Sequence, residues 1–111
     1  MMDDLPTEFL INAQRRIAAQ EGVPLTVVRR GYSSVGTILL KINRLDGTAR
    51  VLTRVRYNDE LVWSPVSKTD PMDEKDAEAY LQRQAGIDPD LWIIEIEDKQ
   101  GRHWFPGKVL V

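Results

Sequence analysis

The stretch VGTILLKINRLDGTARVLTRVRYNDELVWS, residues 35–64, contains three β-rich runs separated by the short polar segments RLDG and ND. Asn, Asp and Gly at such positions are typical of the tight turns that join neighbouring antiparallel strands. In the first run, strict alternation places Ile38, Leu40 and Ile42 on one face. Leu39 and Lys41 fall on the other face. The stretch therefore predicts consecutive antiparallel strands with one apolar face turned to a core.

Helical patterns lie on both sides of this stretch. Apolar residues recur at helical spacing before Gly22 and Pro24, which predicts a helix over residues 6–21. Its core-facing residues are expected to be Phe9, Leu10, Ala13 and Ile17. In the second pattern, Asp70 is placed to cap a helix that begins at Pro71 and ends before Gly86.

Further β-rich runs complete the pattern. PLTVVRR, residues 24–30, precedes a turn at GYSS, and LWIIEIED, residues 91–98, precedes a turn at KQGR and the short run HWF. We therefore expect an α+β fold in a single domain over residues 1–111, with an antiparallel sheet packed against two helices. The sheet is a meander of about four strands plus a C-terminal strand or hairpin. The predicted core consists of Leu10, Ile17, Val27, Ile38, Leu40, Ile42, Val51, Val55, Leu81, Trp92, Ile94 and Ile96.

The composition excludes several classes of protein. Fifteen Lys and Arg against seventeen Asp and Glu residues give a formal net charge of -2, which removes the overall attraction shown by dedicated nucleic-acid binders. The absence of cysteine excludes thiolate metal sites, and the single histidine, His103, excludes a site of several imidazoles. Residues 1–10 lack a secretory pattern, and no apolar run is long enough to cross a bilayer. We therefore expect a cytoplasmic protein without a membrane segment, metal or cofactor.

Four segments follow one another in a recognisable order: VVRRG, KINRLDGTA, DPDLWIIEIED and GRHW. Together they make the chain similar to domain-of-unknown-function family 1491, a family of small alphaproteobacterial proteins. The similarity extends from the first predicted helix to Phe105, and it is weakest in the strand after Arg56 and in the last residues. The resemblance implies no cofactor or site residue, because the family has no assigned activity.

The loop RRGYSSVG, residues 29–36, has the composition of an anion-binding loop. Arg29 and Arg30 are able to bind an anion as a forked pair, with Ser33 and Ser34 at the tip, so these four residues form a candidate anion- or partner-binding site. A phosphate-binding loop normally precedes a helix whose N-terminus faces the anion, and here a strand follows. We favour a hairpin turn, in which Gly31 is a turn residue tolerant of positive φ and the arginines face solvent.

Three arginines share one face of the run TARVLTRVRY, residues 48–57, and are named the arginine face: Arg50, Arg54 and Arg56. Lys41 is expected beside them across the RLDG turn. Such a surface is able to contact nucleic-acid phosphates or an acidic partner. Pairing within the protein, with Glu95, Glu97 or the acidic start of the second helix, is favoured. The reasons are the negative net charge and the lack of an exposed aromatic run beside the arginines.

One pattern points to catalysis. Pro89, Asp90, Glu97 and Lys99 follow the order of PD…ExK nucleases, in which two acids hold Mg²⁺ and the lysine assists attack on phosphate. If the residues between the two acids form one extended strand, Asp90 and Glu97 lie about 20 Å apart, too far for one metal ion. A metal-dependent phosphodiester hydrolase is thus the least favoured alternative.

The favoured function is a non-catalytic binding or interaction module. Its expected partner is another protein, bound through an exposed sheet edge or the RRGYSS loop, and a homo-oligomer is able to form through the same kind of edge. The alternative is weak binding of nucleic acid or a phosphate ligand by the arginine face.

Overall fold

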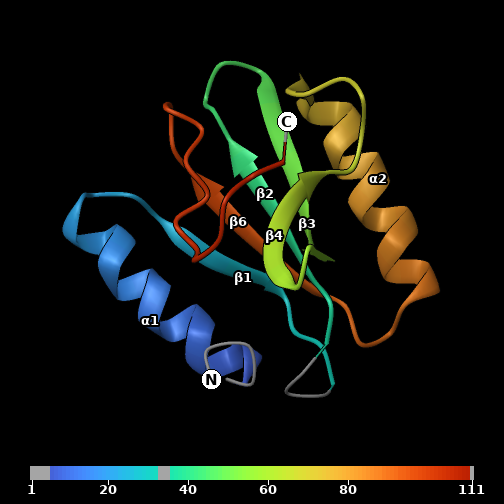
Figure 1. Cartoon of the computed structure of the whole chain (residues 1–111). Helices are drawn as coiled ribbons and strands as arrows, with labels where there is room; N and C mark the ends of the chain where they lie inside the picture. The colour runs from blue at the N-terminus through green and yellow to red at the C-terminus, as the bar shows by residue number, and fades with distance from the viewer. Residues whose placement is uncertain (1–5, 33–35, 111) are drawn as a thin grey trace.

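The computed structural model describes residues 6–32 and 36–110, and within them the chain forms two helices and six strands. In chain order these are α1 (Thr7–Gln20), β1 (Leu25–Arg29), β2 (Ile38–Asn43), β3 (Thr48–Tyr57), β4 (Glu60–Pro65), β5 (Met72–Asp73), α2 (Glu74–Ile87) and β6 (Trp92–Glu97). The predicted α+β fold is confirmed (Figure 1).

The strands form one sheet in the order β1-β6-β2-β3-β4, and the short β5 pairs with β3. Two neighbouring pairs are the predicted hairpins: β2 with β3 and β3 with β4 are antiparallel, and Leu40 of β2 lies opposite Leu52 of β3. In the turn between β3 and β4, Asn58 and Asp59 both have positive φ, 50° and 64°, as a tight hairpin turn requires. Local turn chemistry therefore sets this half of the sheet.

The predicted hairpin between β1 and β2 is wrong, because β6 lies between these two strands. β6 is antiparallel to β1 and parallel to β2, so Ile94 has Val27 on one side and Leu40 on the other. The buried residues of β6 are Trp92, Ile93, Ile94 and Ile96. Because this strand is apolar on both faces, it buries more surface inside the sheet than at an edge.

The segment after β6 is not the predicted hairpin. Trp104 has a positive φ of 67°, and its indole Nε1 donates to Asp98, so HWF does not pair with β6. Further along, Val109 forms an isolated parallel bridge with Trp63 of β4. The last described residues therefore run along β4 instead of extending the other side of the sheet.

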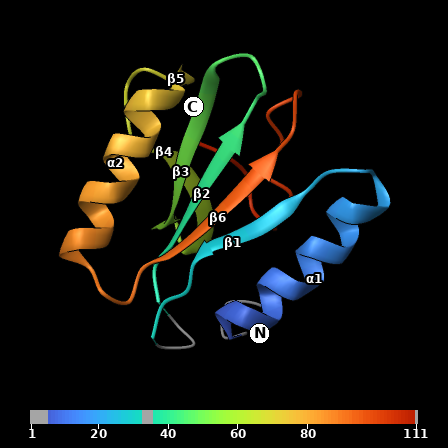
Figure 2. The ribbon, with the colours of Figure 1, turned by 180° about the vertical axis from the view of Figure 1, so that it is seen from behind.

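Both faces of the sheet are buried, whereas the sequence predicted one apolar face. Figures 1 and 2 show the two helices on separate sides of the sheet. The core on the α1 side includes Leu10, Ile11, Ala18, Leu25, Ile38, Leu40, Ile42, Leu52, Trp63, Trp92, Ile94 and Ile96. The core on the α2 side consists of Leu39, Ala49, Val51, Met72, Ala77, Leu81, Leu91 and Ile93. Alternation along β2 therefore separates two cores.

Most predicted core residues are buried, but the prediction for Ile17 is wrong. Ile17 is 47% exposed and Phe9 is 62% exposed. The buried apolar residues of α1 are Leu10, Ile11 and Ala18. Because α1 lies beside the edge strand β1 (Figure 2), only a narrow stripe of the helix reaches the core. Two other predicted core residues are half-buried: Val27 and Val55.

α2 begins at Glu74 and not at the predicted Pro71, because the residues just before Glu74 form β5 and pair with β3. Asp70 does not act as the cap. Its carboxylate accepts hydrogen bonds from the guanidinium of Arg50, with 2.8 Å between Nη2 and Oδ2. Gly86, predicted beyond the helix, lies in its last turn.

Candidate functional site

A buried lysine lies between the sheet and α2. The side chain of Lys41 is only 3% exposed and is paired with three carboxylates. Its ammonium donates to Glu74, at 2.9 Å, and to Glu78, and it lies 3.6 Å from Glu95. We name these four residues the Lys41 cluster. Pairing of this kind allows an ammonium group to remain charged when it is buried.

β6 and α2 bring the three carboxylates to Lys41. β2 and β6 are parallel and in register, which places Glu95 opposite Lys41. Glu74 and Glu78 are four residues apart on α2, so they project from the same side of the helix. The amide of Asn43 donates to Glu74, at 3.1 Å, and to Glu95, at 3.3 Å. The Lys41 cluster therefore ties β2, β6 and α2 together.

The environment keeps Lys41 protonated. Burial by itself lowers the pKa of Lys41, but hydrogen bonds with Glu78 and Glu74 and the charge of Glu95 outweigh burial. The pKa of Lys41 is therefore raised above its ordinary value of 10.5. An ammonium in this state does not act as a general base or a nucleophile at neutral pH.

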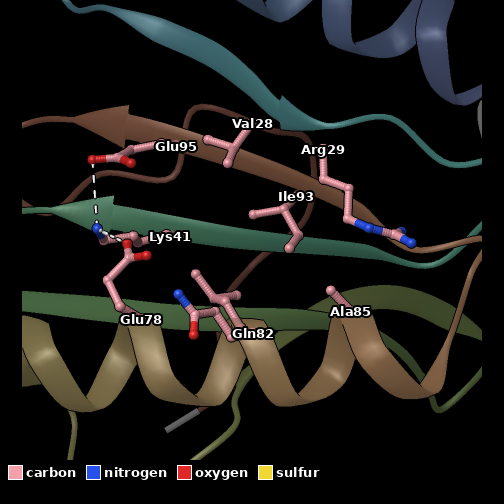
Figure 3. A pocket seen from close by; sticks show the side chains of 9 residues that line it. Val28, Arg29, Lys41, Glu78, Gln82, Ala85, Ile93 and Glu95 are labelled. Carbon is pink, nitrogen blue, oxygen red and sulfur yellow. Dashed lines mark hydrogen bonds and ion pairs between the residues drawn. The ribbon is translucent and has the colours of Figure 1, made fainter.

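An open groove of about 310 Å³ extends from the Lys41 cluster between α2 and the sheet (Figure 3). We name it the α2 groove. Its lining residues are Val28, Arg29, Lys41, Glu78, Leu81, Gln82, Ala85, Ile93 and Glu95. Most of the surface exposed inside the groove is apolar. Arg29 and the Lys41 cluster lie at opposite ends (Figure 3).

A β-bulge in β1 builds the outer wall of the α2 groove. Val27 lies opposite Ile94 and Arg29 lies opposite Ile93, so Val28 is an extra residue in β1. Val28 is 57% exposed and lines the groove together with Arg29, whereas Val27 packs against the core on the α1 side. Regular alternation would place Val27 and Arg29 on the same face. The bulge thus turns Arg29 towards α2.

The two arginines of the candidate anion site contact different parts of the protein. The guanidinium of Arg29 donates to the carbonyl oxygens of Leu91 and Pro89. Arg30 pairs with Glu8 of α1 at 2.5 Å. These contacts direct the two side chains to separate partners instead of a shared anion. The other two residues of that candidate site lie outside the described residues: Ser33 and Ser34.

Two glycines of the same loop are required by close packing. A Cβ atom on Gly31 would lie 2.4 Å from the carbonyl oxygen of Asp90, and one on Gly36 would lie 2.2 Å from it. Gly31 does not use the tolerance of positive φ that the turn interpretation assigned to it, since it is not among the described residues with positive φ. The absence of a side chain instead allows the backbone at Gly31 and at Gly36 to lie directly beside Asp90, in the segment that leads into β6.

The arginine face has contacts within the protein. They include Arg50 with the carboxylate of Asp70 at 2.8 Å, Arg54 with the ring of Trp63 at 5.9 Å from its centroid, and Arg56 with the carbonyl oxygen of Asp59. None of these three partners is among the predicted ones. The prediction that Lys41 joins this face is wrong. Lys41 lies opposite Val51, and alternation along β3 turns Val51 away from the arginines.

His103 is half-buried near the arginine face. Its ring centroid lies 5.9 Å from that of Trp63. Burial is the main cause that lowers the pKa of His103 below its ordinary value of 6.5, and the charge of Arg50 lowers it further. The imidazole is therefore neutral at pH 7.

The residues of the nuclease-like pattern do not converge. Asp90 precedes β6, Glu97 ends it and Lys99 follows it, so the length of the strand separates the two acids. Within residues 6–32 and 36–110, no three His, Cys, Asp or Glu side chains form a group able to hold a metal ion. In those same ranges no helix combines the length and the apolar character needed to cross a membrane.

A family model described as a protein of unknown function (DUF1491) matches residues 5–106. The chain belongs to the DUF1491 family. The predicted resemblance is thus confirmed, and the match includes every residue of the Lys41 cluster and of the α2 groove. No curated protein matches the chain.

Solved structures share the DUF1491 fold. A crystal structure of a DUF1491 family protein from Caulobacter crescentus CB15 is 37% identical, with a TM-score of 0.84 over 96% of this chain and 99% of that one. An NMR structure of a DUF1491 family protein from the same organism is also 37% identical, with a TM-score of 0.81 over 96% and 97% of the two chains. The solution structure of protein Atu0922 from A. tumefaciens is 20% identical, with a TM-score of 0.75 over 93% of each chain, and shows the same fold.

The sequence named Glu95 and the acidic start of the second helix as partners of the arginine face, with Lys41 beside it, and Lys41 does pair with Glu95 and Glu74. Sequence reasoning missed the burial of Lys41, its contact with Glu78 and the α2 groove of this DUF1491 protein. One available signal was a lysine inside the apolar run TILLKI. A second was the pair Glu74 and Glu78, four residues apart in a predicted helix. Neither signal shows that the lysine and the acids meet, because they lie 33 and 37 residues apart in the chain.

Proposed function

We propose that this DUF1491 protein is a non-catalytic binding module that holds a segment of a partner protein in the α2 groove. The observation that carries the proposal is an aliphatic channel of about 310 Å³, open to solvent beside a buried and ion-paired lysine. Binding sites are typically concave and mostly apolar, with a few polar groups that orient the ligand. The α2 groove has this composition.

Two sheet edges are less suited to a partner. β1 is an edge strand, but its bulge at Val28 interrupts the regular ladder that an added strand needs. The edge of β4 is already hydrogen-bonded to the last described residues: the backbone N–H of Trp63 donates to the carbonyl oxygen of Lys108, and that of Leu110 donates to the carbonyl oxygen of Trp63. We therefore propose the α2 groove as the partner site, in place of the sheet edge or RRGYSS loop predicted from the sequence.

The Lys41 cluster supports binding and not catalysis. Its ammonium is held in the charged form by three carboxylates, so it serves to fix α2 against β2 and β6. Apart from Val28 and Arg29 of β1, the lining residues of the groove come from these same elements. A site whose walls are already in place avoids part of the entropic cost of ordering side chains on binding.

A matched pair of substitutions on α2 tests the proposal. Ala85 lines the groove, and Ala79 is exposed elsewhere on the same helix. Immobilised wild-type protein and the Ala79→Phe variant should retain the same proteins from a native extract, whereas the Ala85→Phe variant should lose them. Thermal unfolding of all three proteins controls for folding. Retention that Ala85→Phe does not change, or metal-dependent turnover of a substrate, would contradict the proposal.

A further inference from the structure

We infer that the α2 groove takes an aliphatic cation, namely a lysine or arginine side chain presented by the partner protein. The inference rests on the proposed function and specifies the chemistry of the partner segment. Three features carry it: the aliphatic walls, the groups exposed at the acidic end, and the place of Arg29 at the other end.

The walls of the groove match the stem of such a side chain. The aliphatic lining residues are Val28, Leu81, Ala85 and Ile93. Lysine and arginine side chains pack their methylene groups along apolar surface and keep the charged group at a polar end. Ile93 is only 5% exposed on the sheet, whereas Val28 is 57% exposed, so an occupant would remove the apolar surface of Val28 from water.

At the end formed by the Lys41 cluster, the groove presents carboxylates to solvent. The side chain of Lys41 is 3% exposed, whereas those of Glu78 and Glu95 are 49% and 25% exposed. Together with Glu74, three carboxylates share one ammonium, so negative charge is in excess. A second cation at this end would reduce the repulsion among the carboxylates. The groove is thus complementary to a positive group.

Arg29 determines the end at which the cation is held. It lies opposite Ile93, two residues before Glu95 along β6, and its guanidinium donates to backbone carbonyl oxygens. Its positive charge disfavours a cation at that end and favours the carboxylates at the other. A nucleic-acid backbone would bring phosphates against Glu78 and Glu95, so the observations favour a basic protein segment.

A peptide titration tests the inference on the folded full chain. Three capped glycine pentapeptides differ only in the central residue, which is lysine, arginine or norleucine; norleucine keeps the aliphatic stem without the charge. Amide shifts of ¹⁵N-labelled protein report where each peptide binds. The lysine and arginine peptides should shift amides of β1, β6 and α2 along the groove, with dissociation constants about fivefold lower than that of the norleucine peptide.

Charge-neutralising variants provide the matched control. Glu78→Gln and Glu95→Gln should each weaken binding of the lysine peptide towards that of the norleucine peptide. Asp76→Asn makes the same change of charge at an exposed position of α2 that does not line the groove, and it should leave the affinity unchanged. If one glutamine variant does not fold, the other and Ala85→Phe give the same test, because Ala85→Phe should block the stem.

The outcomes separate this inference from the proposed function. Equal affinity for the lysine and norleucine peptides, shifts away from the groove, or no shifts at all would overturn the inference. Capture of a partner that Ala85→Phe abolishes would in that case leave the proposed function standing. Capture that is insensitive to Ala85→Phe would overturn the proposed function, and the inference with it.

Discussion

Replacing the three carboxylates of the Lys41 cluster by amides should destabilise the protein more than replacing Lys41 itself. The variant with Glu74→Gln, Glu78→Gln and Glu95→Gln keeps the ammonium on a side chain that is 3% exposed, but it removes the three charges paired with it. Removing the partner of a buried charge typically costs about 3 to 5 kcal/mol. We expect a loss of about 3 kcal/mol in unfolding free energy, because the amide oxygens still accept hydrogen bonds.

The opposite change, Lys41→Met, removes the buried charge and keeps an unbranched side chain. The carboxylates left behind are between 25% and 49% exposed, so water hydrates them. Removing one member of a buried ion pair is strongly destabilising when it leaves an uncompensated buried charge, and the exposure of these carboxylates lessens that cost. We therefore expect a loss of about 1 kcal/mol or less, which arises from repulsion among the three acids.

Urea unfolding at pH 7, followed by the fluorescence of the buried Trp63 and Trp92, measures both free energies. A methionine variant less stable than the triple glutamine variant would refute the reasoning, since removing the ammonium would then cost more than leaving it buried without its carboxylates. Unfolding free energies measured at high pH give a second test. Because the pKa of Lys41 is raised in the fold, its pairing stabilises the protein below pH 10.5, and this contribution is lost as the pH rises through the higher folded value. Lys41→Met should lack that alkaline loss.

Three further predictions concern packing, pH and nucleic acid. Gly36→Ala would place a Cβ 2.2 Å from the backbone oxygen of Asp90 and should lower the unfolding free energy by about 1 to 3 kcal/mol. A Cβ on Gly86 would meet nothing within 4 Å, so Gly86→Ala should stabilise α2 by up to about 1 kcal/mol. Thermal unfolding compares the two variants. Because burial and a nearby arginine lower the pKa of His103, the unfolded chain binds a proton near pH 6.5 that the folded chain does not. The unfolding free energy should therefore fall as the pH drops below 6.5. An equal fall in the His103→Gln variant would contradict this prediction. The parent and a triple alanine variant of the arginine face should both fail to bind single- or double-stranded oligonucleotides at moderate salt. Binding of duplex DNA by the parent, with a slope of log affinity against log salt of about -3, would show that the arginines contact phosphates.

The elements that the sequence predicted well depend on contacts between residues close in the chain. The turn at Asn58 and Asp59 specifies the hairpin of β3 and β4 without help from the rest of the protein. The predicted range of α1 differs from the observed helix by one residue at each end. The predicted start of α2 is wrong because Asp70 accepts hydrogen bonds from Arg50, 20 residues away, instead of capping the helix.

The place of β6 required the tertiary structure. Its apolar residues indicate burial on both faces, but nothing in the strand itself selects β1 and β2 as neighbours. The close approach of Gly31 and Gly36 to Asp90 belongs to the same arrangement, since Asp90 lies just before β6. A pattern of turn residues gives no sign of contacts at that separation, so by itself it predicts a hairpin turn.

For the candidate site, alternation in TILLKI by itself determined that Lys41 points away from Ile38 and Leu40. Only the tertiary structure decided that this second face is buried beneath α2. A local pattern states the direction of a side chain but not what covers it. Burial of an ammonium group requires opposite charges, and here they come from α2 and β6, at positions 33 or more residues later in the chain. The Lys41 cluster and the groove beside it therefore exist only once these distant segments have packed against β2.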